Sequence, residues 1–80
     1  MNTKPIIVNC LIGDEEKQIL LDPEYPGSSI YHIFIDKENH GMVQKLRSDW
    51  FVGFGENSML TDFHRDAIIR ALSNAEYLNN

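Results

Sequence analysis

The feature that most constrains this fold is a series of short apolar runs, each ended by a polar break or by one containing proline and glycine. The runs are five to eight residues long and rich in β-branched, leucine or aromatic side chains, a pattern typical of strands joined by turns. They are Ile6 to Ile12, Lys17 to Leu21, Ser29 to Asp36, Met42 to Arg47 and Trp50 to Phe54. The sequence therefore predicts about five strands, and consecutive strands joined by short loops should pair as antiparallel neighbours.

The first two runs are predicted to form a hairpin around the polar tetrad Gly13 to Glu16. Closing the hairpin with these four loop residues pairs Cys10 with Ile19 and Val8 with Leu21. Because side chains alternate along a strand, one face of this hairpin becomes apolar. Its members are Ile6, Val8, Cys10, Ile12, Ile19 and Leu21.

The last three runs are predicted to form a meander with two different faces. If both turns contain an even number of residues, the first face carries Tyr31, Ile33, Ile35, Met42, Gln44, Leu46, Phe51 and Gly53. The second face carries Ile30, His32, Phe34, Val43, Lys45, Arg47, Trp50, Val52 and Phe54. A bulge in either turn would reverse the facing of one strand in this assignment.

A helical pattern follows the last strand. Thr61 is a good N-cap, and Asp62 complements the positive end of a helix dipole. Apolar residues then recur at spacings of three and four, at Leu60, Phe63, Ala67, Ile68, Ala71, Leu72, Ala75 and Leu78. The sequence predicts a helix from Asp62 to Tyr77. The expected fold class is α+β: an antiparallel sheet of about five strands, a hairpin plus a three-stranded meander, with one C-terminal helix packed on one face.

Composition limits the size and the partners of the domain. Eighty residues, 42% of them hydrophobic, are enough for one small globular domain over residues 1–80. A formal charge of −5 weakens attraction to nucleic acid and to anionic membranes. Cys10 is the only cysteine and is interpreted as a small buried hydrophobe, and the N-terminal apolar run is too short for a signal peptide or a membrane span. We expect a cytoplasmic protein without a membrane partner.

No residue pattern identifies a catalytic, cofactor or metal site. His32, His40 and His64 lack the close spacing of metal ligands, and we interpret them as surface or rim side chains. A small enzyme would have to bring these histidines together with Asp36 or Asp62 through the tertiary fold. We therefore expect no metal and no cofactor.

The second face of the meander does not fit a simple two-layer domain. If the helix covers the side of Tyr31, Ile33 and Leu46, an aromatic and basic face stays exposed, and exposed apolar patches usually mark interfaces. The predicted interaction surface consists of Ile30, His32, Phe34, Lys45, Arg47, Trp50, Val52 and Phe54. Two alternatives stay open: the first hairpin or the loop Asp22 to Ser29 shields this face, or the helix packs on it instead.

The leading functional hypothesis is a non-catalytic interaction module, either a small homo-oligomer or an accessory subunit of another protein. The alternative is nucleic-acid binding through the sheet, with His32, Lys45, Arg47 and Trp50 as contacts, which the acidic charge of the chain opposes. A small enzyme with an unrecognised site is the third class.

Overall fold

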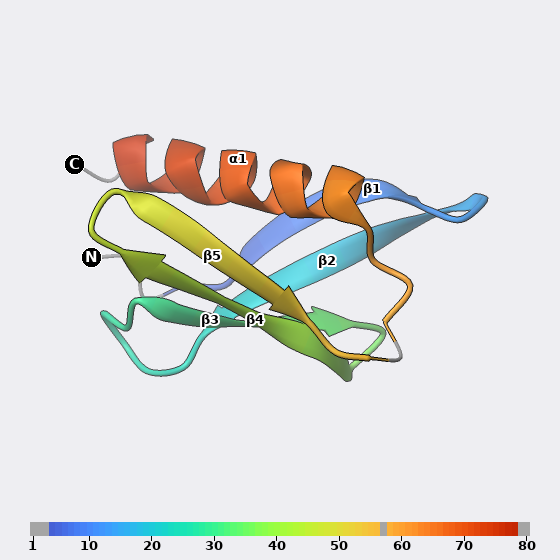
Figure 1. The fold of residues 1–80 in the computed structure, drawn as a ribbon, viewed down its shortest axis with the longest axis horizontal. Helices are drawn as coiled ribbons and strands as arrows, with labels where there is room; N and C mark the ends of the chain where they lie inside the picture. The colour runs from blue at the N-terminus through green and yellow to red at the C-terminus, as the bar shows by residue number, and fades with distance from the viewer. Residues whose placement is uncertain (1–3, 57, 79–80) are drawn as a thin grey trace.

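The computed structural model describes residues 4–56 and 58–78, which form one antiparallel sheet and a C-terminal helix (Figure 1). The elements are β1 (Ile6–Ile12), β2 (Glu15–Pro23), β3 (Ile30–Ile35), β4 (Glu38–Leu46), β5 (Asp49–Phe54) and α1 (Asp62–Leu78). The order of strands in the sheet is the order along the chain, so all five strands form a single meander. The predicted α+β fold is confirmed, and the first hairpin joins the later strands through β2 and β3.

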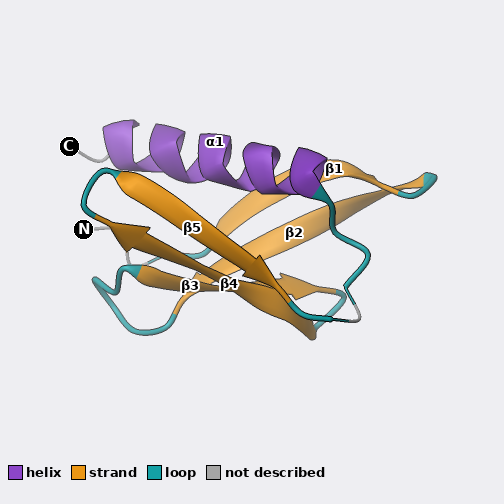
Figure 2. Ribbon diagram, viewed as in Figure 1, coloured by secondary structure: helices purple, strands orange, loops and turns teal. Residues whose placement is uncertain are grey.

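The helix forms a second layer on one face of the sheet (Figure 2). It packs against β1. We call the sheet face beneath α1 the inner face and the opposite one the outer face. Within the described part of the chain, no helix has the length and apolarity that a membrane crossing requires.

The core lies between α1 and the inner face. Its buried members are Ile12, Ile19, Leu21, Tyr31, Ile33, Ile35, Val43, Leu60, Ile68 and Leu72. The remaining apolar residues of the predicted hairpin face, Ile6, Val8 and Cys10, pack against this cluster. Burial of these side chains removes apolar surface from water and is the main force that holds the helix on the sheet.

The first hairpin has a shorter turn than the sequence predicts. Only Gly13 and Asp14 lie outside the strands, and Gly13 has a φ of 65°, a conformation that favours glycine. As a result Val8 pairs with Ile19, and the predicted pairing of Cys10 with Ile19 is wrong by two residues. A shift of two keeps the alternation of side chains, so the predicted apolar face still points into the core.

A β-bulge in the second hairpin changes which side of the sheet β4 and β5 present. Ile33 pairs with Gly41 and Phe34 pairs with Asn39, which leaves His40 as the extra residue. One extra residue reverses the facing of every later side chain relative to β3. The predicted faces of the meander are therefore wrong across the β3–β4 pair.

Burial confirms this reversal. Val43, predicted on the face away from the helix, is completely buried, whereas Met42 is 45% exposed. Leu46, predicted beneath the helix, is 49% exposed on the outer face. The facing of β4 and that of β5 reverse together, because Val43 pairs with Val52 and the two residues share a face, as predicted.

The bulge depends on the glycine that follows the extra residue. Gly41 has a φ of 142°, and a Cβ added there would lie 2.0 Å from the carbonyl oxygen of Gly53. The Asn39 side chain accepts a hydrogen bond from the Gly41 amide at 2.9 Å, and the His40 carbonyl accepts one from Gly55 at 2.9 Å. The close approach of two backbones at Gly41 leaves no room for a side chain.

The helix is rotated slightly from the predicted stripe. Ile68 and Leu72 are buried as expected, but Phe63 is 68% exposed, and His64 occupies the buried position one turn before Ile68. The side chain of Leu78, the last member of the predicted stripe, lies outside the described residues.

His64 is buried because both of its ring nitrogens have partners. The Thr61 amide donates to Nδ1 at 3.0 Å, so Nε2 carries the hydrogen and donates to the carbonyl oxygen of Leu11 at 2.7 Å. His64 thus acts as the reciprocal cap that Glu or Gln usually provides three residues after the N-cap, and it also ties α1 to β1. The interpretation of His64 as a surface or rim side chain is wrong.

Candidate interaction surface

The bulge divides the eight residues of the predicted interaction surface between two faces. Ile30, His32 and Phe34 lie on the outer face, while Lys45, Trp50, Val52 and Phe54 lie on the inner face, and Arg47 lies in the β4–β5 turn. The prediction that they form one continuous face is therefore wrong. The same division separates His32 from Lys45 and Trp50, which were the expected nucleic-acid contacts.

The inner group is packed against the core. The Trp50 ring lies with its centroid 6.1 Å from that of Tyr31, and the Lys45 ammonium lies 5.4 Å from the centre of the Trp50 ring. Val52 and Phe54 pack against the buried cluster. These side chains stabilise the rim of the core, with the lysine held over the aromatic ring by a cation–π interaction.

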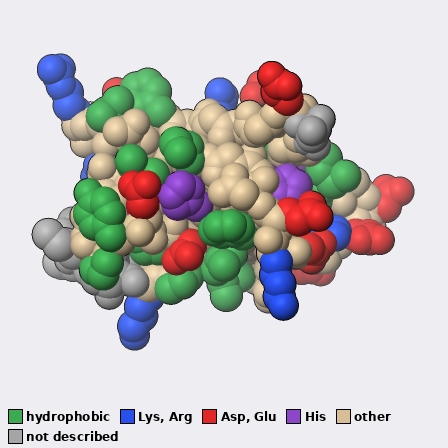
Figure 3. Space-filling view, turned by 90° about the horizontal axis from the view of Figure 1, so that it is seen from below, with side chains coloured by type: hydrophobic (Ala, Val, Ile, Leu, Met, Phe, Trp, Pro, Cys, Tyr) green, Lys and Arg blue, Asp and Glu red, His purple; other side chains and the backbone are tan. Residues whose placement is uncertain are grey.

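The outer face is nevertheless apolar over much of its area, with a membership different from the predicted one. Ile7, Met42 and Phe51 are 55%, 45% and 55% exposed. The strand pairings place the following apolar side chains on this face: Ile7, Leu11, Leu20, Ile30, Phe34, Met42, Leu46 and Phe51. Figure 3 views the molecule from the side away from the helix, where hydrophobic side chains lie among histidine and acidic ones.

One of the open alternatives holds in part: α1 packs on the inner face, which carries the Trp50, Val52 and Phe54 members of the predicted surface. The first hairpin does not shield the outer members, because it is part of the same sheet. The signal that could have revealed the true membership is Gly41, since a glycine inside a strand pattern often marks a bulge.

His32 is the main polar group at the centre of the outer face. Its ring lies 6.4 Å from that of Phe34, and its Nε2 lies 3.7 Å from a carboxylate oxygen of Glu24. Asp22 is its neighbour on β2 and Met42 is its neighbour on β4. The histidine therefore separates an apolar region over β1, β2 and β3 from a second one over β4 and β5.

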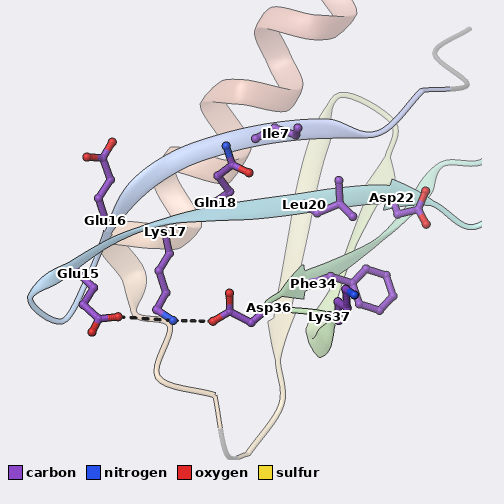
Figure 4. A pocket seen from close by; sticks show the side chains of 10 residues that line it. All are labelled: Ile7, Glu15, Glu16, Lys17, Gln18, Leu20, Asp22, Phe34, Asp36 and Lys37. Atoms are coloured by element: carbon purple, nitrogen blue, oxygen red, sulfur yellow. Dashed lines mark hydrogen bonds and ion pairs between the residues drawn. The ribbon is translucent and has the colours of Figure 1, made fainter.

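The first of these regions contains a hollow of about 750 Å³ (Figure 4). Ile7, Leu20 and Phe34 come from three adjacent strands and supply its apolar lining. The polar lining comes from Glu15, Glu16, Lys17, Gln18, Asp22, Asp36 and Lys37.

Lys17 is already paired within this hollow. Its ammonium donates to Asp36 at 2.5 Å and lies 3.7 Å from a carboxylate oxygen of Glu15. The hydrogen bond with Asp36 is the largest of the effects that raise the pKa of Lys17, so this lysine stays charged. The pair fixes the β3–β4 turn against β2. We call the outer side chains of β2 that line the hollow, which are Glu16, Gln18, Leu20 and Asp22, the β2 ridge. Glu16 and Asp22 are the carboxylates at its two ends.

The histidines and aspartates that an enzyme site would need do not lie together. His40 Nδ1 lies 3.0 Å from the Ser58 hydroxyl beside a cleft of about 240 Å³, but this hydroxyl also accepts a hydrogen bond from the Leu60 amide at 3.2 Å. The contact thus ties the bulge to the loop that leads into α1. His64 and Asp36 have the partners already described, and Asp62 lies beside Arg65 at 3.9 Å.

Other reactive groups do not form a site either. Within residues 4–56 and 58–78, no group of three or more histidine, cysteine or acidic side chains is arranged to hold a metal ion. Cys10 is half-buried on the inner face, and burial raises the pKa of its thiol, which disfavours the reactive thiolate.

Comparison with known proteins adds no relative. No protein-family model matches this sequence, and neither the curated proteins nor the solved structures contain a significant match to it.

Proposed function

We propose that this protein is a non-catalytic interaction module that binds another protein through the outer face of its sheet. The observation that carries the proposal is the set of exposed apolar side chains on that face, of which Ile7, Met42 and Phe51 are about half exposed. Exposed apolar side chains that gather on one face of a protein usually mark an interface. The lone cysteine is compatible with a reducing compartment such as the cytoplasm.

The size of the face suits such a role. Five strands about 4.8 Å apart, six to nine residues long at about 3.3 Å per residue, cover roughly 600 Å² in projection. A standard interface buries about 800 Å² of accessible surface on each partner, and accessible area exceeds projected area on a surface with side chains. The outer face can therefore supply most of one side of an ordinary interface.

A different protein is favoured over a second copy by charge. Each copy carries a formal charge of −5, so two copies that approach each other repel. Self-association through the same face is the second candidate, because the apolar side chains would pack equally well on their own copies. Both occupants involve the same residues and differ in the mass of the complex.

The test places the photo-crosslinking amino acid p-benzoylphenylalanine at Phe51 or at Phe63 and irradiates the protein in the cells that make it. These positions are matched controls, because both are phenylalanine and are 55% and 68% exposed, but Phe51 lies on the outer face and Phe63 on α1. A discrete adduct from position 51 that is absent from position 63 is the expected result. An adduct at twice the mass of the chain would identify self-association, and a larger discrete adduct another protein.

The proposal is wrong if position 51 forms no adduct, or if both positions give the same adducts. Light scattering of the purified wild-type protein and of Phe51→Ser supplies an independent measurement of self-association. A monomer in both cases, together with a discrete heterologous adduct, supports the accessory-subunit form of the proposal.

A further inference from the structure

From the lining of the outer-face hollow we infer the chemistry of the partner: a polypeptide segment with an apolar centre flanked by lysine or arginine docks along β2. This inference rests on the proposed function, because it names what binds to one region of the outer face. Two properties of the hollow support it, namely an apolar floor with a carboxylate at each end and a lining with more carboxylates than lysines.

The apolar floor is formed by side chains that no other part of the described chain covers completely. Ile7 on β1, Leu20 on β2 and Phe34 on β3 are neighbours in one row across the three strands. Ile7 is 55% exposed, and the other two are half-buried. An apolar side chain from a partner would cover this row, and the apolar surface removed from water would stabilise the complex in proportion to its area.

Carboxylates bracket this floor. Glu16, Gln18, Leu20 and Asp22 follow one another along the outer side of β2, with an acidic residue at each end (Figure 4). The lining as a whole contains four carboxylates and two lysines, and Lys17 is already paired with Asp36 and Glu15. Cationic side chains therefore complement both ends of the ridge.

The surroundings strengthen this preference. The β1–β2 turn, the β3–β4 turn, the loop before α1 and the first turns of α1 gather at one end of the molecule (Figure 1), where His64 contacts Leu11 and Gly55 contacts His40. This end carries eight carboxylates and three cations, so its net charge of −5 equals the formal net charge of the whole chain. They are Asp14, Glu15, Glu16, Asp36, Glu38, Glu56, Asp62 and Asp66, with Lys17, Lys37 and Arg65. Such a one-sided field attracts a cationic segment and repels an acidic one.

The spacing along β2 defines the length of the segment. Glu16 and Asp22 are six residues apart in one strand, a separation of about 20 Å at about 3.3 Å per residue. An extended segment needs about seven residues to bring one cation to each carboxylate. Its central residues then lie over Leu20 and its neighbours in the row.

The test measures the binding of fluorescein-labelled seven-residue peptides to the intact protein by fluorescence anisotropy. The probe has lysine at positions 1 and 7 and leucine at positions 3 and 5. One control replaces both lysines with glutamate, and another replaces both leucines with serine. We expect the lysine–leucine peptide to bind at least about tenfold more tightly than either control, and its affinity to fall as salt is added.

Two pairs of protein variants locate the site. Glu16→Gln combined with Asp22→Asn should weaken binding about fivefold, whereas Asp49→Asn, on the outer face but outside the hollow, should change it less than twofold. Ile7→Thr should weaken binding about threefold or more, whereas Leu46→Thr, a similarly exposed residue elsewhere on the face, should not. Circular dichroism of each variant verifies that it is folded.

The inference is overturned if the glutamate peptide binds as well as the lysine peptide, if Asp49→Asn has the same effect as the charge variants in the hollow, or if no peptide binds below about 1 mM. These failures are distinct from failure of the proposed function. A discrete adduct from position 51 combined with no preference among the peptides would leave the outer face as an interface and exclude a basic segment as its partner.

Discussion

The bulge at His40 makes one prediction that separates the observed fold from the nearest alternative. In the structure Val43 is completely buried and Met42 is 45% exposed. Without the extra residue the two side chains would exchange places, with methionine in the core and valine outside. Replacing each in turn with alanine therefore measures which of the two strand facings the protein has in solution.

The expected cost of Val43→Ala follows from its burial. The substitution removes two buried methyl groups, and each loses about 0.8 kcal/mol of burial free energy. The remaining cavity of roughly 50 Å³ costs about 1 kcal/mol more, which gives a total of about 2 to 3 kcal/mol. In a domain of this size that loss lowers Tm by about 10 to 20 °C. Met42→Ala removes more atoms, but from a surface position, and should cost less than about 1 kcal/mol.

Urea unfolding followed by the fluorescence of Trp50, the only tryptophan, provides the measurement. Comparable m-values in the wild type and both variants would show that the differences are changes in stability. If Met42→Ala destabilises the protein as much as Val43→Ala does, or more, the bulge is absent. The assignment of Met42 and Phe51 to the outer face would then be wrong as well.

Three further measurements test other parts of the structure. Gly41→Ala should lower the free energy of unfolding by more than about 2 kcal/mol in urea titrations, because the new Cβ would collide with the Gly53 carbonyl; an unchanged midpoint would contradict the backbone approach. His64→Ala should cost about 2 to 4 kcal/mol, since it opens a cavity and leaves the buried Leu11 carbonyl without its donor, and a Tm within 2 to 3 °C of the wild type would count against burial of this ring. Alkylation of Cys10 by iodoacetamide should have its midpoint above the ordinary pKa of 9.0 in the folded protein and near that value in urea. Since burial keeps the thiol protonated in the folded state only, its contribution to stability should be full below pH 9 and decrease as the pH rises beyond it; equal midpoints in both states would refute this.

Much of the fold follows from local signals in the sequence. The five apolar runs correspond to β1 through β5, and Thr61 with Asp62 correctly marks the start of α1. The apolar face of the first hairpin was predicted correctly although its register was not, because a two-residue shift preserves the alternation of side chains. Signals of this kind depend on neighbours along the chain and survive small errors in the length of turns.

The interaction surface could be predicted only in outline. An apolar face opposite the helix was expected and is present, and Ile30, His32 and Phe34 lie on it. The β4 and β5 residues that we expected on this face lie on the opposite one. A single unpaired residue reverses the facing of the strands that follow it, and the sequence does not show which residues stay unpaired. The hollow was missed because it combines side chains from three strands whose relative register had to be known first.

The sequence by itself determined which segments become strands, where the helix begins and which side of the first hairpin is apolar, since these properties depend on the local spacing of apolar and polar residues. The tertiary structure alone decided the facing of β4 and β5 and the burial of His64. Gly41 can form the bulge because the backbone of β5 passes close to it, and His64 can enter the core because a carbonyl on β1, distant in sequence, accepts its hydrogen. A buried polar ring and a reversed strand are each stable only when their partners are in place, and those partners are assembled by the fold.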